Sequence, residues 1–157
     1  MLLVSGCSQF AGAGLAFRDD PVVRITTPTH RARVRAPFTL RWRALRPLPR
    51  GGRYEILVDR APQPPGARPD RLAHGDDGCR HTPGCPDATW YAAHGVFLTR
   101  GTLFDVPFVA PIRDERSSTL HDATIVVLDG TGRRVGEAGA FLEFHLVAEP
   151  NGIIESG

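Results

Sequence analysis

Apolar and polar residues alternate along several short stretches of this chain, as they do in strands with one buried face. The clearest stretch is 38–43, where the two alternating sets are Phe38, Leu40 and Trp42, and Thr39, Arg41 and Arg43. Further short runs rich in β-branched and aromatic residues occur at 22–26, 53–59, 96–99, 102–109, 123–128 and 140–147. We predict a strand at each of these places, and Pro107 indicates an edge strand or a bulge. The pattern is therefore that of an all-β domain.

Turn residues separate these runs. Asp129-Gly130-Thr131-Gly132 is a hairpin-turn signal between 123–128 and the last strand. His121 comes just before the strand expected at 123–128, and we expect it to close a loop. Residues 60–95 are dense in Pro, Gly, Asp and His, and only 87–93 shows a possible helical turn. Structureless loops of this length are uncommon and are usually functional or disordered, so 60–95 is the best candidate for a binding surface.

About seven short strands with turn chemistry between them predict an antiparallel β-sandwich. The segments 21–28, 37–42, 54–59 and 121–147 resemble immunoglobulin-like and fibronectin-III-like modules, and the closing segment is similar to bacterial extracellular sandwich domains. We expect the sandwich over 21–148, with 60–95 as a loop insertion and 149–157 as a C-terminal tail. The resemblance departs from antibody domains, because both cysteines of the domain lie in the insertion rather than one in each sheet.

The first residues carry a different resemblance. Val4-Ser5-Gly6-Cys7 resembles the lipobox of bacterial lipoproteins, which implies lipid on Cys7 and export, with 8–20 as a tether. All 19 basic residues are Arg, which is typical of a GC-rich genome, so the resemblance is to secreted lipoproteins of the actinobacterial type. Only six residues precede Cys7 and none is basic, whereas a signal peptide has a basic start and a longer apolar run. Residues 1–20 are therefore either a signal remnant with a lipobox and tether, or a short apolar N-terminus.

Lipid on Cys7 would leave Cys79 and Cys85 as a pair among the 3 cysteines. Pro83-Gly84 between them favours a tight turn, and a disulfide fits an oxidising compartment. The alternative is a zinc site made by His74, Cys79, His81 and Cys85. Zinc accepts two thiolates and two imidazoles, but this spacing is unlike a familiar zinc finger. A disulfide without a cofactor is the first interpretation, and the zinc site stays as the second.

Two sets of side chains are candidates for partner contact. Trp90 and Tyr91 supply rigid aromatic surface, and they either anchor a partner or fold back to seal the end of the sandwich. Arg41 and Arg43 have strand spacing, as do Arg31, Arg33 and Arg35, and the two sets form one basic face if they lie on adjacent strands. Such a face is either a solvated surface or a site for anionic lipid headgroups, cell-wall polymers or an acidic protein. Nucleic acid is disfavoured, because the aromatic residues alternate with the arginines toward the core.

No nucleophile elbow, metalloprotease motif, phosphate-binding loop or dinucleotide fingerprint occurs in the chain. No stretch approaches the roughly 20 apolar residues of a membrane span. We therefore expect a non-enzymatic binding or accessory module of the cell envelope. Its partner is an envelope protein or an anionic cell-surface polymer. We expect the protein outside the cytoplasm, attached to the membrane by lipid alone or secreted.

Overall fold

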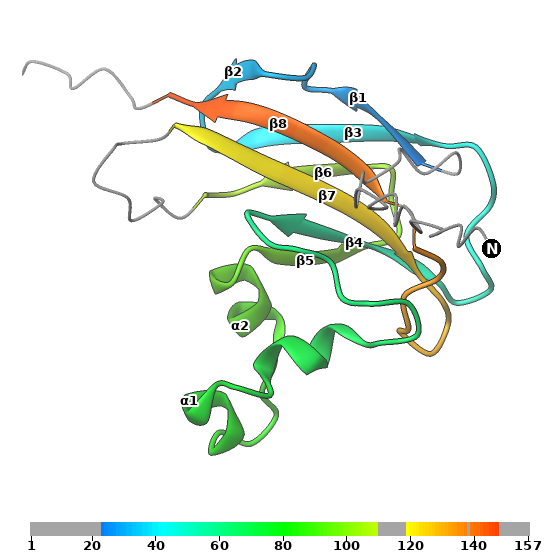
Figure 1. Cartoon of the computed structure of the whole chain (residues 1–157), viewed down its shortest axis with the longest axis vertical. Coiled ribbons are helices and arrows are strands. Elements are labelled where there is room, and N and C mark those ends of the chain that lie inside the picture. Colours follow the sequence, from blue (N-terminus) through cyan, green and yellow to red (C-terminus); the bar gives the residue numbers. More distant parts are fainter. Residues whose placement is uncertain (1–22, 110–118, 138, 148–157) are drawn as a thin grey trace, which may run out of the picture.

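The computed structural model describes residues 23–109, 119–137 and 139–147. These residues form eight strands in two sheets. The three-stranded sheet has the order β1 (Val23–Thr27), β3 (Phe38–Ala44), β6 (Leu103–Val106). The five-stranded sheet has the order β2 (Ala32–Val34), β8 (Ala140–Leu146), β7 (Leu120–Leu128), β4 (Arg53–Val58), β5 (Val96–Thr99). The all-β prediction is confirmed (Figure 1).

The main core lies between the two sheets, because alternate residues of each strand point inward. Trp42 of β3 is 2% exposed and meets Tyr54 of β4 edge to face, with 5.3 Å between ring centroids. The ring centroid of Phe38 of β3 lies 5.0 Å from that of Phe144 of β8, with the two rings tilted by 54°. Aromatic pairs of this kind add to the free energy gained by burying their apolar area. The alternation at 38–43 thus predicted the buried side of β3 correctly.

β2 was not predicted, and it changes the placement of the arginines. The chain crosses from one sheet to the other between β1 and β2, and β2 pairs in parallel with β8, with Arg33 opposite His145. Arg41 and Arg43 lie on β3, in the three-stranded sheet. The expectation of one continuous basic face is therefore wrong, because the two sets of arginines stand on different sheets.

The insertion 60–95 is folded rather than structureless. It contains a 3₁₀ helix, η1 (Pro69–Ala73), and two short helices, α1 (Asp77–Arg80) and α2 (Ala88–Ala93), the last of which matches the helical turn expected at 87–93. Gly95 ends α2 with φ +70°, and a Cβ there would meet the Val58 carbonyl oxygen at 2.6 Å. Only glycine fits at this position, and it allows the chain to turn from the end of α2 directly into β5.

The insertion covers part of the outer face of the five-stranded sheet. A second apolar cluster forms there from Leu57, Val96, Val126 and Leu128, with Leu72 and Tyr91 packed against it. α1 lies farthest from the sheets in Figure 1. The insertion is therefore fixed at its base and projects at its tip.

The remaining strand predictions need small corrections. β6 ends at Val106, one residue before Pro107, and lies at a sheet edge as predicted. β7 begins at Leu120, so that His121 lies in a strand and not in a loop. In the turn at 129–132, Asp129 Oδ1 accepts bonds from the Thr131 amide and hydroxyl and from the Arg133 amide. No helix in the described segments is both long and apolar enough to cross a membrane.

Cys7, the tether 8–20 and the tail 149–157 lie outside the described residues. The same holds for residues 21–22 and 148, at the two ends of the predicted domain.

Candidate functional site

The tip of the insertion is closed by a disulfide between Cys79 and Cys85, whose Cα atoms lie 5.2 Å apart. This confirms the predicted pairing. The zinc alternative fails, because its two thiolates are joined to each other. Within the described ranges, no group of three or more His, Cys, Asp or Glu side chains could hold a metal ion.

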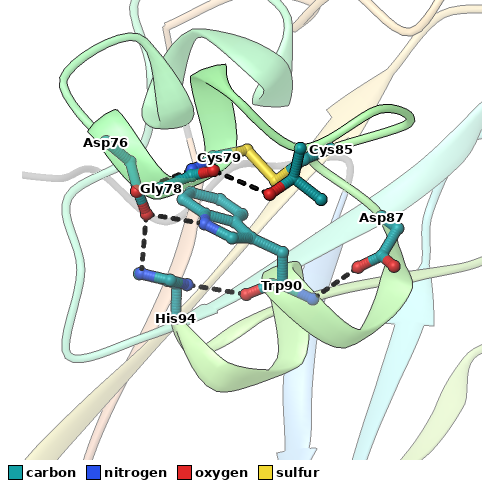
Figure 2. Close-up of a disulfide and its surroundings, with 8 residues drawn as sticks. Asp76, Gly78, Cys79, Cys85, Asp87, Trp90 and His94 are labelled. Atoms are coloured by element: carbon teal, nitrogen blue, oxygen red, sulfur yellow. Dashed lines mark hydrogen bonds and ion pairs between the residues drawn. A yellow bond between two sulfur atoms is a disulfide. The ribbon is translucent and has the colours of Figure 1, made fainter.

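Asp76 links the two helices of the tip (Figure 2). Its Oδ1 accepts the Cys79 amide at 2.9 Å and so caps the start of α1, while its Oδ2 accepts the Trp90 indole N–H at 2.8 Å. The Cys79 amide and then the Trp90 indole hold the pKa of the Asp76 carboxyl below its usual range. One carboxylate therefore satisfies donors from α1 and from α2.

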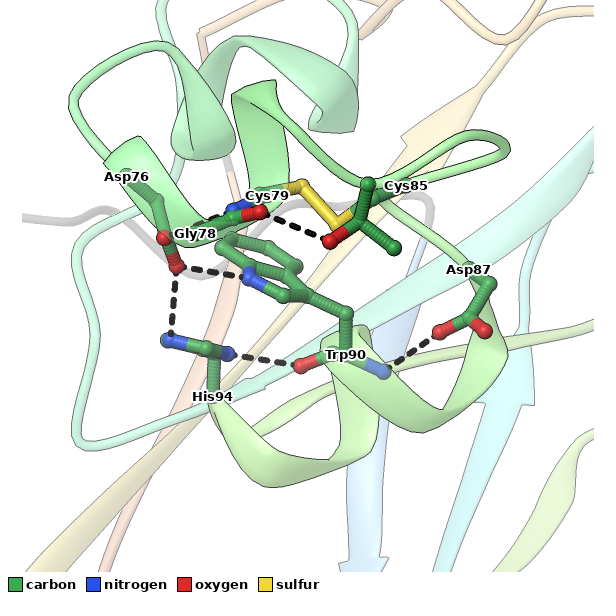
Figure 3. Close-up of polar contacts among 8 residues, drawn as sticks. Asp76, Gly78, Cys79, Cys85, Asp87, Trp90 and His94 are labelled. Atoms are coloured by element: carbon green, nitrogen blue, oxygen red, sulfur yellow. Dashed lines mark hydrogen bonds and ion pairs between the residues drawn. A yellow bond between two sulfur atoms is a disulfide. The ribbon is translucent and has the colours of Figure 1, made fainter.

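His94 completes this cluster at the end of α2 (Figure 3). Its ring stacks on the Trp90 indole with 3.8 Å between centroids, and its Nδ1 lies 2.7 Å from the Trp90 carbonyl oxygen. Its Nε2 lies 3.8 Å from Asp76 Oδ2. Because the carbonyl can only accept, Nδ1 carries the proton in that hydrogen bond. Protonation of Nε2 would add a cation that faces both the carboxylate and the indole.

Trp90 and Tyr91, the two predicted aromatic contacts, are each half-buried. Trp90 is held by Asp76 and His94 within the tip. Tyr91 packs against the second apolar cluster on the sheet. Burial raises the pKa of the Tyr91 phenol above its ordinary value, and the carboxylates of Asp70 and Glu55 raise it further. The two rings thus have defined structural contacts, and a role in partner contact stays a prediction for their exposed edges.

A shallow groove of about 430 Å³ lies beside the disulfide. Its lining residues are Asp70, Ala73, His74, Cys79, Arg80, Cys85 and Pro86. His74 and Arg80 are exposed, and Arg80 also pairs with Asp77. Three members of the proposed zinc set therefore meet at this groove, while His81 is not part of its lining. The groove is open to solvent and carries the charged side chains of Asp70 and Arg80 on its walls.

The base of the insertion hides a carboxyl group that sequence reasoning did not single out. Glu55 of β4 is 1% exposed, and neither carboxylate oxygen has a hydrogen-bond partner in the part of the chain that the structure describes. Burial raises its pKa to about 7, against an opposing effect of the Arg134 charge. Arg134 itself is buried and donates to the carbonyl oxygens of Gln63 and Glu137. We predicted a strand at 53–59 and did not predict that the insertion covers its outer face here.

A second missed feature lies where β4 ends. Asp59 accepts a hydrogen bond from His121 at 2.7 Å through Oδ2 and one from the Asp122 amide at 3.0 Å through Oδ1. Its φ of 53° is uncommon for a residue other than glycine. His121 is buried and stacks on Phe144. Burial, then the charges of Asp59 and Glu143, raise the pKa of Asp122 above its ordinary value.

Two small cavities of about 180 Å³ each adjoin Asp59 and Arg60. The lining of the first includes His94, and that of the second includes Asp122 and the buried Thr124. The Asp59–His121 pair links the end of β4 to β7.

Arg41 and Arg43, the predicted basic contacts, are exposed on the outer face of the three-stranded sheet. Arg24 of β1 lies directly opposite Arg43 on the same face. None of these three forms an ion pair with a carboxylate in the described segments.

Comparison with profiles of known protein families, with curated proteins and with solved structures gave no match.

Proposed function

We propose that this protein is a non-enzymatic binding module of the cell envelope, and that the tip of the insertion contacts its partner. The observation that carries the proposal is the construction of the tip. A disulfide, a shared carboxylate and a stacked histidine fix some 20 residues that build no part of either sheet. A surface ordered before binding loses less entropy on association, so such rigidity favours recognition.

The groove beside the disulfide is the proposed contact surface. His74 and Arg80 present polar groups at its rim, and the exposed edges of Trp90 and Tyr91 belong to the same insertion. The mixed charges of Asp70, His74 and Arg80 fit a polar segment of a partner protein. Arg80 is already paired with Asp77, so we expect it to orient a partner's polar groups more than to add net attraction.

Location in the envelope is the second part of the proposal. The lipobox-like Val4-Ser5-Gly6-Cys7 supports a lipid anchor, and the Cys79–Cys85 disulfide supports an oxidising compartment. The immunoglobulin-like assignment also belongs here. Two packed sheets over a buried Trp42 support it.

Intact mass of the exported protein, with and without reduction, tests the location. We expect lipid on Cys7 and two thiols that become reactive only after reduction. An unmodified Cys7 with free Cys79 and Cys85 would reject the envelope assignment.

The contact is tested by extracting the protein from the cell envelope and measuring the size of the complex that it forms. His74→Ala with Arg80→Ala should release the chain from a complex that the wild type retains. The matched control replaces Arg100 and Thr102, which are exposed in the turn between β5 and β6, outside the insertion. Equal behaviour of the two double variants would reject the groove as the contact.

A further inference from the structure

The outer face of the three-stranded sheet is unusual in its charge. Arg24 and Arg43 are a directly opposed cross-strand pair, and Arg41 follows on the same side of β3. Like charges in directly opposed positions destabilise a sheet. The single carboxylate among the described residues of this face, Asp105, lies at its far end and accepts a hydrogen bond from Thr39. The sheet therefore holds three unneutralised guanidinium groups at a cost to its own stability.

The same face is open and carries apolar surface next to the charges. All three arginines are exposed, and Leu103 of β6, opposite Arg41, is 43% exposed. These residues line neither the groove beside the disulfide nor the two cavities next to Asp59. A surface with guanidinium groups around an exposed leucine matches an extended anionic layer with apolar material beneath it.

We infer that this face docks on the anionic headgroups of a bilayer. The inference rests on the lipid anchor in the proposed function, because an anchored protein has the headgroups of its own membrane as the nearest anions. Residues 8–22 connect Cys7 to β1, an edge strand of this same sheet, and fully extended they reach about 50 Å. A lipid on Cys7 would hold the arginines near a charged membrane surface, where each contributes to attraction and the effective concentration is high.

Docking of this face also leaves the proposed contact surface free. β1, β3 and β6 form one sheet, whereas the insertion packs on the outer face of the other sheet. In Figure 1, α1 and α2 lie below β4 and β5, whereas β1 and β3 lie near the top of the molecule. The tip would then point away from the membrane toward a partner.

The test uses the Cys7→Ser chain, so that lipid cannot carry the binding. Sedimentation with vesicles of phosphatidylcholine plus phosphatidylglycerol should show binding that high salt removes, and vesicles of phosphatidylcholine alone should show none. The variant with Arg24, Arg41 and Arg43 all changed to Gln should partition about 100-fold less. Because it relieves repulsion in the sheet, this variant should fold, which its melting curve checks.

The matched control changes three other exposed arginines, Arg33, Arg35 and Arg71, to Gln, with the same loss of charge. An equal loss of binding in the control would overturn the inference in favour of unspecific charge. Failure of the Cys7→Ser chain with all its arginines to bind anionic vesicles would also overturn it, as would binding to a soluble polyanion such as polyphosphate in place of vesicles. The lipid anchor is tested separately, by the intact mass that shows whether Cys7 carries lipid, so either claim can fail without the other.

Discussion

The indole N–H of Trp90 donates a hydrogen bond to Asp76 over 2.8 Å, across 14 residues of sequence. The same carboxylate caps α1 through the Cys79 amide. The bond therefore joins the beginning of α1 to α2, and with the disulfide it closes the tip of the insertion from two sides. Helices as short as α1 and α2 do not persist alone in water, so the tip depends on these links.

Asp76→Ala should loosen the tip without unfolding the sheets. The change removes the helix cap and leaves the Trp90 indole without its acceptor, so amide exchange over 76–94 should rise about five- to tenfold. Exchange in β4 and β7 should stay the same. Hydrogen exchange with mass spectrometry measures both regions at once.

Asp77→Ala is the matched control for this change. Asp77 is the next residue, but its carboxylate only pairs with Arg80 on the surface. Pairs of this kind contribute little to stability. If Asp77→Ala and Asp76→Ala raised exchange equally, the Asp76–Trp90 link would not be what orders the tip.

Glu55 predicts an unusual dependence of stability on pH. Its pKa rises from 4.5 to about 7 on folding, so the folded state holds a proton that the unfolded state has already released. The contribution of this bound proton to the free energy of unfolding is complete below pH 4.5 and is lost as the pH rises toward 7. The loss amounts to about 3 kcal/mol of the free energy of unfolding. Urea unfolding at a series of pH values measures it.

Glu55→Gln should remove this component, because the amide keeps the shape of the protonated carboxyl and cannot ionise. Glu137→Gln is the control, since the Glu137 side chain is exposed. We expect the stability of Glu55→Gln to vary less between pH 5 and 8 than that of the wild type, with Glu137→Gln unchanged. A pH dependence that survives in Glu55→Gln would assign it to other groups.

Asp59→Asn tests the link between β4 and β7. The amide can still accept the Asp122 N–H, but the negative charge beside His121 is gone. We expect a loss of about 1–2 kcal/mol in the free energy of unfolding. The pKa of Asp122 should fall toward its ordinary value, because one cause of its rise has been removed. Titration of the carboxyl groups by NMR measures this change. An unchanged pKa of Asp122 would contradict the role given to the Asp59 charge.

Removing the disulfide tests how far the tip is independent of the sheets. Cys79→Ser with Cys85→Ser should cost about 2 kcal/mol in the chain-entropy account of so short a loop. The cost should fall on the insertion, so exchange should rise over 74–94 and stay low in β3 and β7. Global unfolding at the same denaturant concentration as loss of the tip would show that the two are one cooperative unit.

Sequence patterns predicted the strands and the disulfide well because both follow from local signals. The alternation at 38–43 and the apolar run at 123–128 are read directly from neighbouring residues, and Pro83-Gly84 favours the turn that brings Cys79 to Cys85. β2 has only three residues and pairs with β8 from the far end of the chain. No local pattern specifies such a pairing, and the division of the arginines between sheets followed from it.

The helices of the insertion left weak signals that could have been found. Asp76 and Asp87 each precede a helix and accept the amide three residues later, which is a capping pattern. The burial of Glu55 left none, because it depends on the insertion folding back over β4 and on Arg134 from a distant turn. The candidate site was therefore located by loop length and composition, while its internal contacts required the three-dimensional arrangement.

The central claim, that the tip of the insertion contacts a partner, is tested most directly by site-specific photocross-linking in intact cells. The photoreactive side chain would replace His74 or Arg80 at the groove, or Thr131 as the exposed control outside the insertion. We predict one discrete protein adduct from the two groove positions and none from Thr131. Adducts absent from both groove positions, or equally strong from Thr131, would contradict the claim.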